Sequence, residues 1–142
     1  MGGIVTFPGL GIYHGSKFVL EGITEALGKE VAGFGIKVIA VEPGGFRTDW
    51  AGRSMRRGDQ HIDDCAALFA PLRQARAERN GKQVGDPAKA AAAIYAIVGE
   101  SDPPAHLLLG TDALSFVSTK LDALQAEIGR WTHVTTSTDV SH

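Results

Sequence analysis

Tyr13-His14-Gly15-Ser16-Lys17 begins the longest regular pattern in the first half of the chain. Downstream of it, apolar side chains recur every three or four positions, which predicts an amphipathic helix over residues 13–34. Gly33 and Gly35 supply its end. Residues four apart lie above one another on the same helix face, so the phenol of Tyr13 and the ammonium of Lys17 are expected to act together. The residues of the apolar stripe are Leu20, Ile23, Leu27, Val31 and Phe34.

The pairing of Tyr13 with Lys17 has a chemical consequence. A lysine ammonium near a phenol favours the phenolate and lowers the tyrosine pKa from its reference value of about 10. A position in the first helical turn acts in the same direction through the helix dipole. A tyrosine tuned in this way can exchange a proton with a substrate. Because the same spacing also occurs in simple surface contacts, the segments that follow must show whether the pair has this chemical role. For the neighbouring His14 we expect an exposed position.

A buried strand is predicted directly after this helix. Residues 36–41 form a nearly unbroken β-branched run, which is typical of a strand buried on both faces of a parallel sheet. Glu42-Pro43-Gly44-Gly45 ends the run. Alternation of helix and strand predicts the α/β class, in which ligands gather at the carboxyl ends of the strands. Pro43 and Gly44 lie at one such end.

The rest of the chain continues the alternation after a less regular region. Residues 46–85 are rich in arginine and hold a helical pattern that Pro71 is expected to interrupt. Asp86-Pro87 predicts a helix start, and residues 106–109 a second buried strand closed by Gly110. Thr111 or Asp112 is expected to cap a last helix, whose apolar face is core or, alternatively, a partner surface. Residues 132–142 are expected to form a flexible tail.

Composition limits the possible functions. The 142 residues are 44% hydrophobic and 21% charged, which fits one globular domain. A net charge of −2 with interspersed signs predicts no nucleic-acid binding. No apolar run approaches the roughly 20 residues that span a bilayer, so no membrane association is expected. The single Cys65 fits a reducing compartment, and a soluble cytoplasmic protein is the expectation. The five histidines show no metal-ligand spacing, so no metal is expected.

Tyr13-x-x-x-Lys17, a helix, a strand and Pro43-Gly44 followed by Thr48 together resemble the classical short-chain dehydrogenase/reductase family. The resemblance implies a Rossmann-like doubly wound parallel sheet with flanking helices, of which residues 1–131 are the C-terminal half. It implies an NAD(P)-dependent oxidoreductase that moves a hydride between the nicotinamide and an alcohol or carbonyl substrate. NAD and NADP are not distinguished. Residues 46–85 match the family's substrate-binding loop or lid.

The same resemblance implies roles for individual residues. Tyr13 would be the general acid/base, and Lys17 would lower its pKa and bind the nicotinamide ribose. Pro43 and Gly44 would pack beside the nicotinamide ring, and Thr48 would hold its carboxamide. The helix of residues 13–34 would pack in the interface of a homo-oligomer. Glycine allows such a close approach of backbone to a flat ring.

Parts of the family pattern are missing from this sequence. The Gly-rich cofactor loop and the Asn-Ala-Gly segment are absent, and the catalytic serine would fall immediately before Met1. We therefore expect a truncated chain, whose activity in isolation is open. The alternative is a non-catalytic fragment that acts as an interaction or oligomerisation module. A sheet without its first strands also predicts exposed apolar surface and association.

Overall fold

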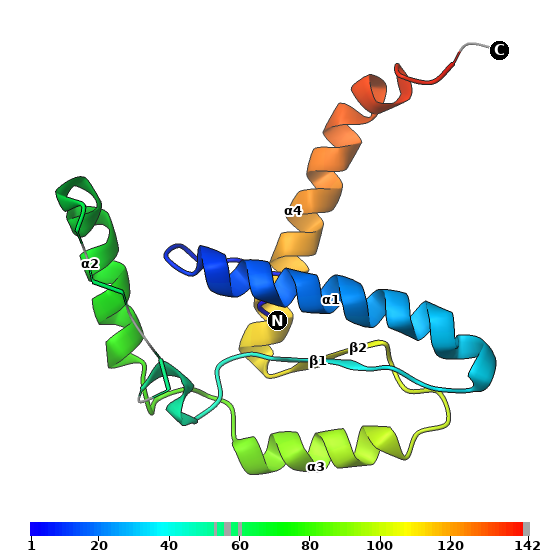
Figure 1. The fold of residues 1–142 in the computed structure, drawn as a ribbon, viewed down its shortest axis with the longest axis horizontal. Coiled ribbons are helices and arrows are strands. Elements are labelled where there is room, and N and C mark those ends of the chain that lie inside the picture. Colours follow the sequence, from blue (N-terminus) through cyan, green and yellow to red (C-terminus); the bar gives the residue numbers. More distant parts are fainter. Residues whose placement is uncertain (53, 56–57, 60, 141–142) are drawn as a thin grey trace.

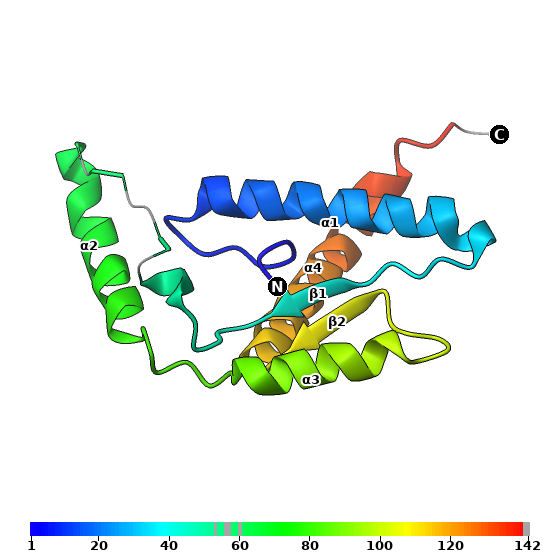
Figure 2. The ribbon, with the colours of Figure 1, turned by 60° about the horizontal axis from the view of Figure 1, so that its bottom comes forward.

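A computed structural model describes residues 1–52, 54–55, 58–59 and 61–140 (Figure 1). Helices and strands alternate as expected for the α/β class, and the two strands pair in parallel. In both views the strands lie between α1 and α3, while α2 stands apart from them (Figure 2). The elements are α1 (Gly11–Val31), the 3₁₀ turn η1 (Ala32–Phe34), β1 (Ala40–Pro43), the 3₁₀ turn η2 (Asp49–Ala51), α2 (Asp63–Glu78), α3 (Pro87–Val98), β2 (His106–Leu109) and α4 (Thr111–Thr136).

The sheet pairs β1 with β2 in the register Ala40 to His106 and Pro43 to Leu109. The predicted second strand coincides with β2, but the first lies later than the expected residues 36–41. Among the described residues β1 pairs with one strand, β2, so its hydrogen bonds to another strand lie along one edge only. Its apolar residues are therefore not buried on both faces, and Val41 keeps 39% of its surface exposed. The expected open strand edge is confirmed.

Helix α1 turns an unexpected face to the sheet. The 3₁₀ turn η1 that continues it ends as predicted at Gly35, whose φ of 73° is readily adopted only by glycine. However, the apolar residues Leu20, Ile23 and Leu27 are 43–60% exposed, and the face with His14 and Glu21 is covered instead. A Cβ added at Gly28 would lie 3.7 Å from Val38 Cβ, so this part of the helix is in ordinary contact with the segment before β1.

The region between residues 46 and 85 is more helical than expected. Helix α2 runs through Pro71 without interruption, so the expected break is wrong. A proline inside a helix removes one hydrogen bond and crowds the preceding turn, but the flanking residues of α2 are alanine, leucine and arginine, which favour helix. The start of α3 is as predicted: the Asp86 carboxylate accepts a hydrogen bond of 2.9 Å from the Ala88 N–H.

Helix α4 is longer and more exposed than expected. It continues to Thr136, five residues into the predicted tail. Val117 is buried, but Leu121 and Trp131 are more than half exposed, so most of the apolar face is not core in this chain. Neither Thr111 nor Asp112 caps the helix through its side chain. No helix among the described residues is long and apolar enough to cross a membrane.

Candidate active site

Tyr13 and Lys17 lie together in the first two turns of α1. The Lys17 ammonium lies over the Tyr13 ring, 5.7 Å from its centroid, as the i, i+4 spacing predicts. The ring of Trp50, from η2, lies 5.4 Å from the Tyr13 ring. A Cβ placed on Gly2 would lie 3.4 Å from the Tyr13 hydroxyl oxygen. The backbone next to Met1 is thus close to the phenol.

The pKa of Tyr13 is not lowered in this chain. Partial burial of the phenol raises its pKa above the ordinary value of 10.0, because removal from water penalises the phenolate. The expected lowering by Lys17 is therefore wrong for this state. The ammonium lies over the face of the ring, where it attracts the π electrons.

The turn after β1 is held by Asp112, which the sequence had suggested as a cap of the last helix. The Gly45 N–H donates a hydrogen bond of 2.6 Å to Asp112 Oδ2, and the Gly44 N–H donates one of 2.9 Å to the Leu109 carbonyl. Added methyl groups at Gly44 or Gly110 would collide with the same carboxylate. Glycine is required here because Asp112 fills the space of a side chain. The sequence indicated that Asp112 lies at a helix start, but it did not indicate that the side chain binds the Gly45 N–H.

Pro43 and Thr48 are exposed, and Gly44 is half-buried, at the carboxyl end of β1. Thr48 Oγ1 accepts a hydrogen bond of 3.4 Å from the Trp50 N–H. The Pro43 carbonyl accepts one of 3.4 Å from the Met1 ammonium. The described residues offer no Gly-rich turn for the pyrophosphate.

His14 is buried rather than exposed, which corrects the expectation from the sequence. Only 2% of its surface is accessible. Its Nε2 accepts a hydrogen bond of 2.9 Å from the Phe7 N–H, and its Nδ1 lies 2.9 Å from the Gly2 carbonyl. These partners favour the neutral ring protonated on Nδ1. His14 therefore fixes the N-terminal segment beside Tyr13.

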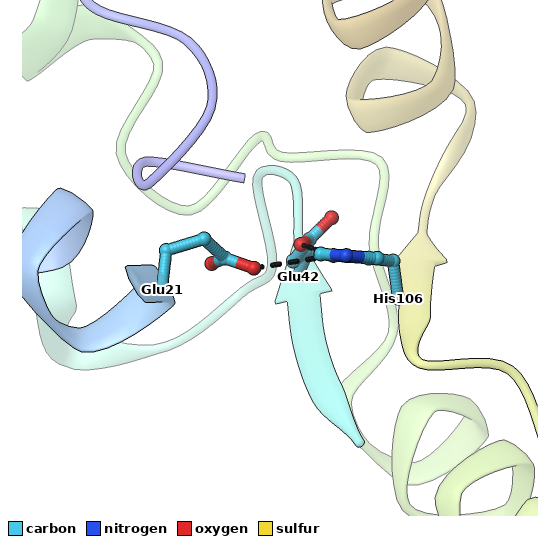
Figure 3. Close-up of side chains that lie close together, drawn as sticks. All are labelled: Glu21, Glu42 and His106. Carbon is cyan, nitrogen blue, oxygen red and sulfur yellow. Dashed lines mark hydrogen bonds and ion pairs between the residues drawn. The ribbon is translucent and has the colours of Figure 1, made fainter. Parts of the chain in front are cut away.

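A second polar cluster lies behind the site. Glu21, Glu42 and His106 come from α1, β1 and β2 and point toward one another (Figure 3). Nothing in the sequence spacing indicates it, because the three residues are brought together only by strand pairing and helix packing. Two hollows border the site region: one of about 150 Å³ beside α2, and one of about 330 Å³ lined partly by Glu21 and His106. Neither is lined by Tyr13 or Lys17.

Comparison with known proteins agrees with the fold and with the family resemblance. The family model described as short chain dehydrogenase matches residues 1–58. An oxidoreductase of Botryotinia fuckeliana is 36% identical over 134 residues, covering 92% of this chain and 47% of that protein. A 3-ketodihydrosphingosine reductase of Bacteroides thetaiotaomicron is 38% identical over 115 residues, covering 78% of this chain and 41% of that protein.

The structural comparison is closer still. A crystal structure of a short-chain dehydrogenase from Streptomyces avermitilis is 40% identical and has a TM-score of 0.85, covering 98% of this chain and 50% of the other. Fold, motif and relatives thus define an oxidoreductase class with a parallel sheet and flanking helices. The chain belongs to the short-chain dehydrogenase family, and it spans about half the length of the relatives it matches.

Proposed function

We propose that the protein to which this chain belongs is an NAD(P)-dependent dehydrogenase or reductase acting on an alcohol or carbonyl group. The observation that carries the proposal is the pairing of Tyr13 with Lys17, one turn apart and half-buried at the start of α1. The membership of the family supports it.

In this proposal Tyr13 is the catalytic acid and base. Its phenol donates a proton to the oxygen of a carbonyl substrate, or accepts one from an alcohol. Burial holds the proton on the phenol in the free chain, which suits the acid role. Lys17 stabilises the phenolate that remains after transfer, since its ammonium lies within reach of the ring. The substrate is a small molecule of otherwise open identity.

The cofactor would be held at its nicotinamide end by residues of this chain. Pro43 and Gly44 would lie against the ring, Thr48 would bind the carboxamide, and Lys17 would bind the ribose hydroxyls. When bound, the nicotinamide supplies the hydride, and the protein orients it. The pyrophosphate would need a Gly-rich turn at a helix N-terminus, which the described residues do not offer, so we assign its binding to other residues of the whole protein.

The outward face of α1 supports self-association as part of the same proposal. Leu20, Ile23 and Leu27 lie on an exposed stripe of the helix that carries Tyr13. A monomer rarely leaves such a stripe uncovered, so we place a homo-oligomer contact along α1. Analytical ultracentrifugation of the Leu20→Glu/Leu27→Glu variant tests it. Loss of association is expected, and unchanged association would contradict this contact.

The catalytic proposal is tested in a hybrid enzyme. In the hybrid, this chain is joined behind the part of the Streptomyces avermitilis dehydrogenase that it does not cover. NADH or NADPH oxidation is measured with a panel of ketones and aldehydes. Tyr13→Phe keeps the shape and removes the hydroxyl, and activity is expected to fall at least about 100-fold. Tyr95→Phe is the matched control, because Tyr95 is 86% exposed. Full activity of Tyr13→Phe in an active hybrid would refute the assignment.

A further inference from the structure

The cluster of Glu21, Glu42 and His106 joins the helix of Tyr13 to both strands (Figure 3). His106 Nδ1 lies 2.9 Å from Glu42 Oε1 and 3.2 Å from Glu21 Oε1. The side chain of Glu42 is only 3% exposed, that of Glu21 21% and that of His106 48%. Glu21 lies one turn beyond Lys17 on α1, and Glu42 directly precedes Pro43.

The charges in the cluster balance only if protons are retained. Burial and the neighbouring Glu42 carboxylate both disfavour a charge on the partly buried Glu21. Burial, followed by a hydrogen bond with Glu42, raises the pKa of Glu21. A hydrogen bond to the Glu42 carboxylate raises the pKa of His106. An imidazolium between two carboxylates, one of them readily protonated, fits these directions.

Other charged groups surround the cluster. The Met1 ammonium interacts with Glu21 and Glu42, and Glu25 on α1 also acts on His106. Lys17 and Asp112 act on the Met1 ammonium. Glu42 Oε2 is a buried atom without a hydrogen-bond partner among the described residues, and Glu21 Oε1 lies within ion-pair distance, 3.2 Å, of His106 Nδ1. His106, when protonated, is therefore a counter-charge to both carboxylates.

We propose that Glu21, Glu42 and His106 form a positioning tie that fixes the helix carrying Tyr13 and Lys17 against the strand carrying Pro43 and Gly44. The inference deepens the proposed function and rests on it. The proton-transfer groups and the cofactor turn lie on different elements, so their distance depends on contacts between α1 and β1. The polar tie supplies that contact, since the apolar stripe of α1 faces away from the sheet.

The tie explains why a carboxylate is buried at the end of β1. An apolar side chain at this position would pack against the helix without fixing its rotation or its height along the strand. Hydrogen bonds and ion pairs are directional, and His106 Nδ1, which contacts both Glu42 Oε1 and Glu21 Oε1, joins three elements at one point. Desolvation of these charges costs free energy. In return the ion pair specifies the placement of the helix, which is the best-supported use of buried ion pairs.

The test compares Glu42→Gln and Glu21→Gln with the control Glu30→Gln, an exposed glutamate of the same helix. In the hybrid enzyme, kcat of Glu42→Gln is expected to fall between about 10-fold and 100-fold, with a smaller change in KM, because misplacement by about 1 Å has such effects. The low-pH limb of the kcat profile should also move, since the hydrogen bond to the Glu42 carboxylate that raises the pKa of His106 is lost. Unchanged kcat and pH profile in a folded Glu42→Gln protein would overturn the proposal.

A second measurement keeps the tie testable apart from activity. Amide hydrogen exchange in the first three turns of α1 should accelerate at least about 10-fold in Glu42→Gln and in the milder His106→Gln, but not in Glu30→Gln. If the hybrid of the unchanged chain is inactive, the proposed function fails while exchange still decides the tie. If exchange does not change, the tie itself is wrong.

Addition of Mn²⁺ or Zn²⁺ distinguishes the alternative of a cation site, because the same three side chains are possible metal ligands. The tie predicts no rise in melting temperature with either ion, since His106 Nδ1 already carries the proton shared with Glu42. A rise in the unchanged chain that is absent in Glu42→Gln would overturn the proposal.

Discussion

The contact of Gly44 with Asp112 gives the sharpest stability prediction. In Gly44→Ala the new methyl would collide with Asp112 Oδ1 and lie 2.6 Å from Cγ and 2.7 Å from Oδ2. The carboxylate must then move and lose its 2.6 Å hydrogen bond from the Gly45 N–H. Hydrogen bonds to charged groups contribute about 1.5–3 kcal/mol, so we expect Gly44→Ala to cost about 2 kcal/mol.

Asp112→Ala removes the same hydrogen bond directly and should cost a similar amount, about 2 kcal/mol. In the double variant the obstacle to the methyl is gone, so the total should stay near 2 kcal/mol rather than about 4. Urea unfolding of the hybrid enzyme, followed by tryptophan fluorescence, measures all three. Gly129→Ala is the control, since nothing lies within 4 Å of its added Cβ. Additive costs in the double variant would refute the reasoning.

Three further predictions concern burial, pH and surface. His14→Phe should lower the free energy of unfolding by about 2 kcal/mol, because it removes the two hydrogen bonds of the buried His14 ring. His133→Phe on the exposed part of α4 should change this free energy little, and thermal melts followed by spectroscopy compare the two variants. Folding raises the pKa values of Glu21 and His106, so the folded state holds more protons than the unfolded state. The melting temperature should therefore fall as pH rises from about 5 to 8, and this pH dependence should be flatter in His106→Gln. A steeper pH dependence in His106→Gln would contradict this. The isolated chain should self-associate in sedimentation experiments, and Ile128→Glu should weaken this association because Ile128 is 60% exposed.

Local signals predicted the elements that depend only on their own residues. Asp86-Pro87 marked the start of α3, Gly35 marked the end of the turn η1 that continues α1, and residues 106–109 coincide with β2. These features follow from capping, backbone conformation and β-branched or leucine-rich runs, which act within a few residues. The motif of Tyr13 and Lys17 was visible for the same reason, since i, i+4 spacing fixes a shared helix face.

Features that depend on distant partners were not predictable. His14 reads as a surface residue until the N-terminal segment supplies Phe7 and Gly2 as its hydrogen-bond partners. Asp112 reads as a helix cap until strand pairing brings the Gly45 N–H to it. Burial of the phenol likewise decides the direction of the Tyr13 pKa, and sequence spacing contains no measure of burial.

The apolar faces of α1 and α4 show how the length of the chain and its packing are linked. A stripe of apolar residues predicts a buried face, but not what buries it. Here two strands cover one side of α1 through polar contacts, and Leu20 on α1 and Ile128 on α4 stay exposed. The relatives are about twice as long, so their additional chain offers more surface for packing. The polar tie at Glu42 joins α1 to both strands in this chain, so we expect loss of one of its charges to change the position of Tyr13.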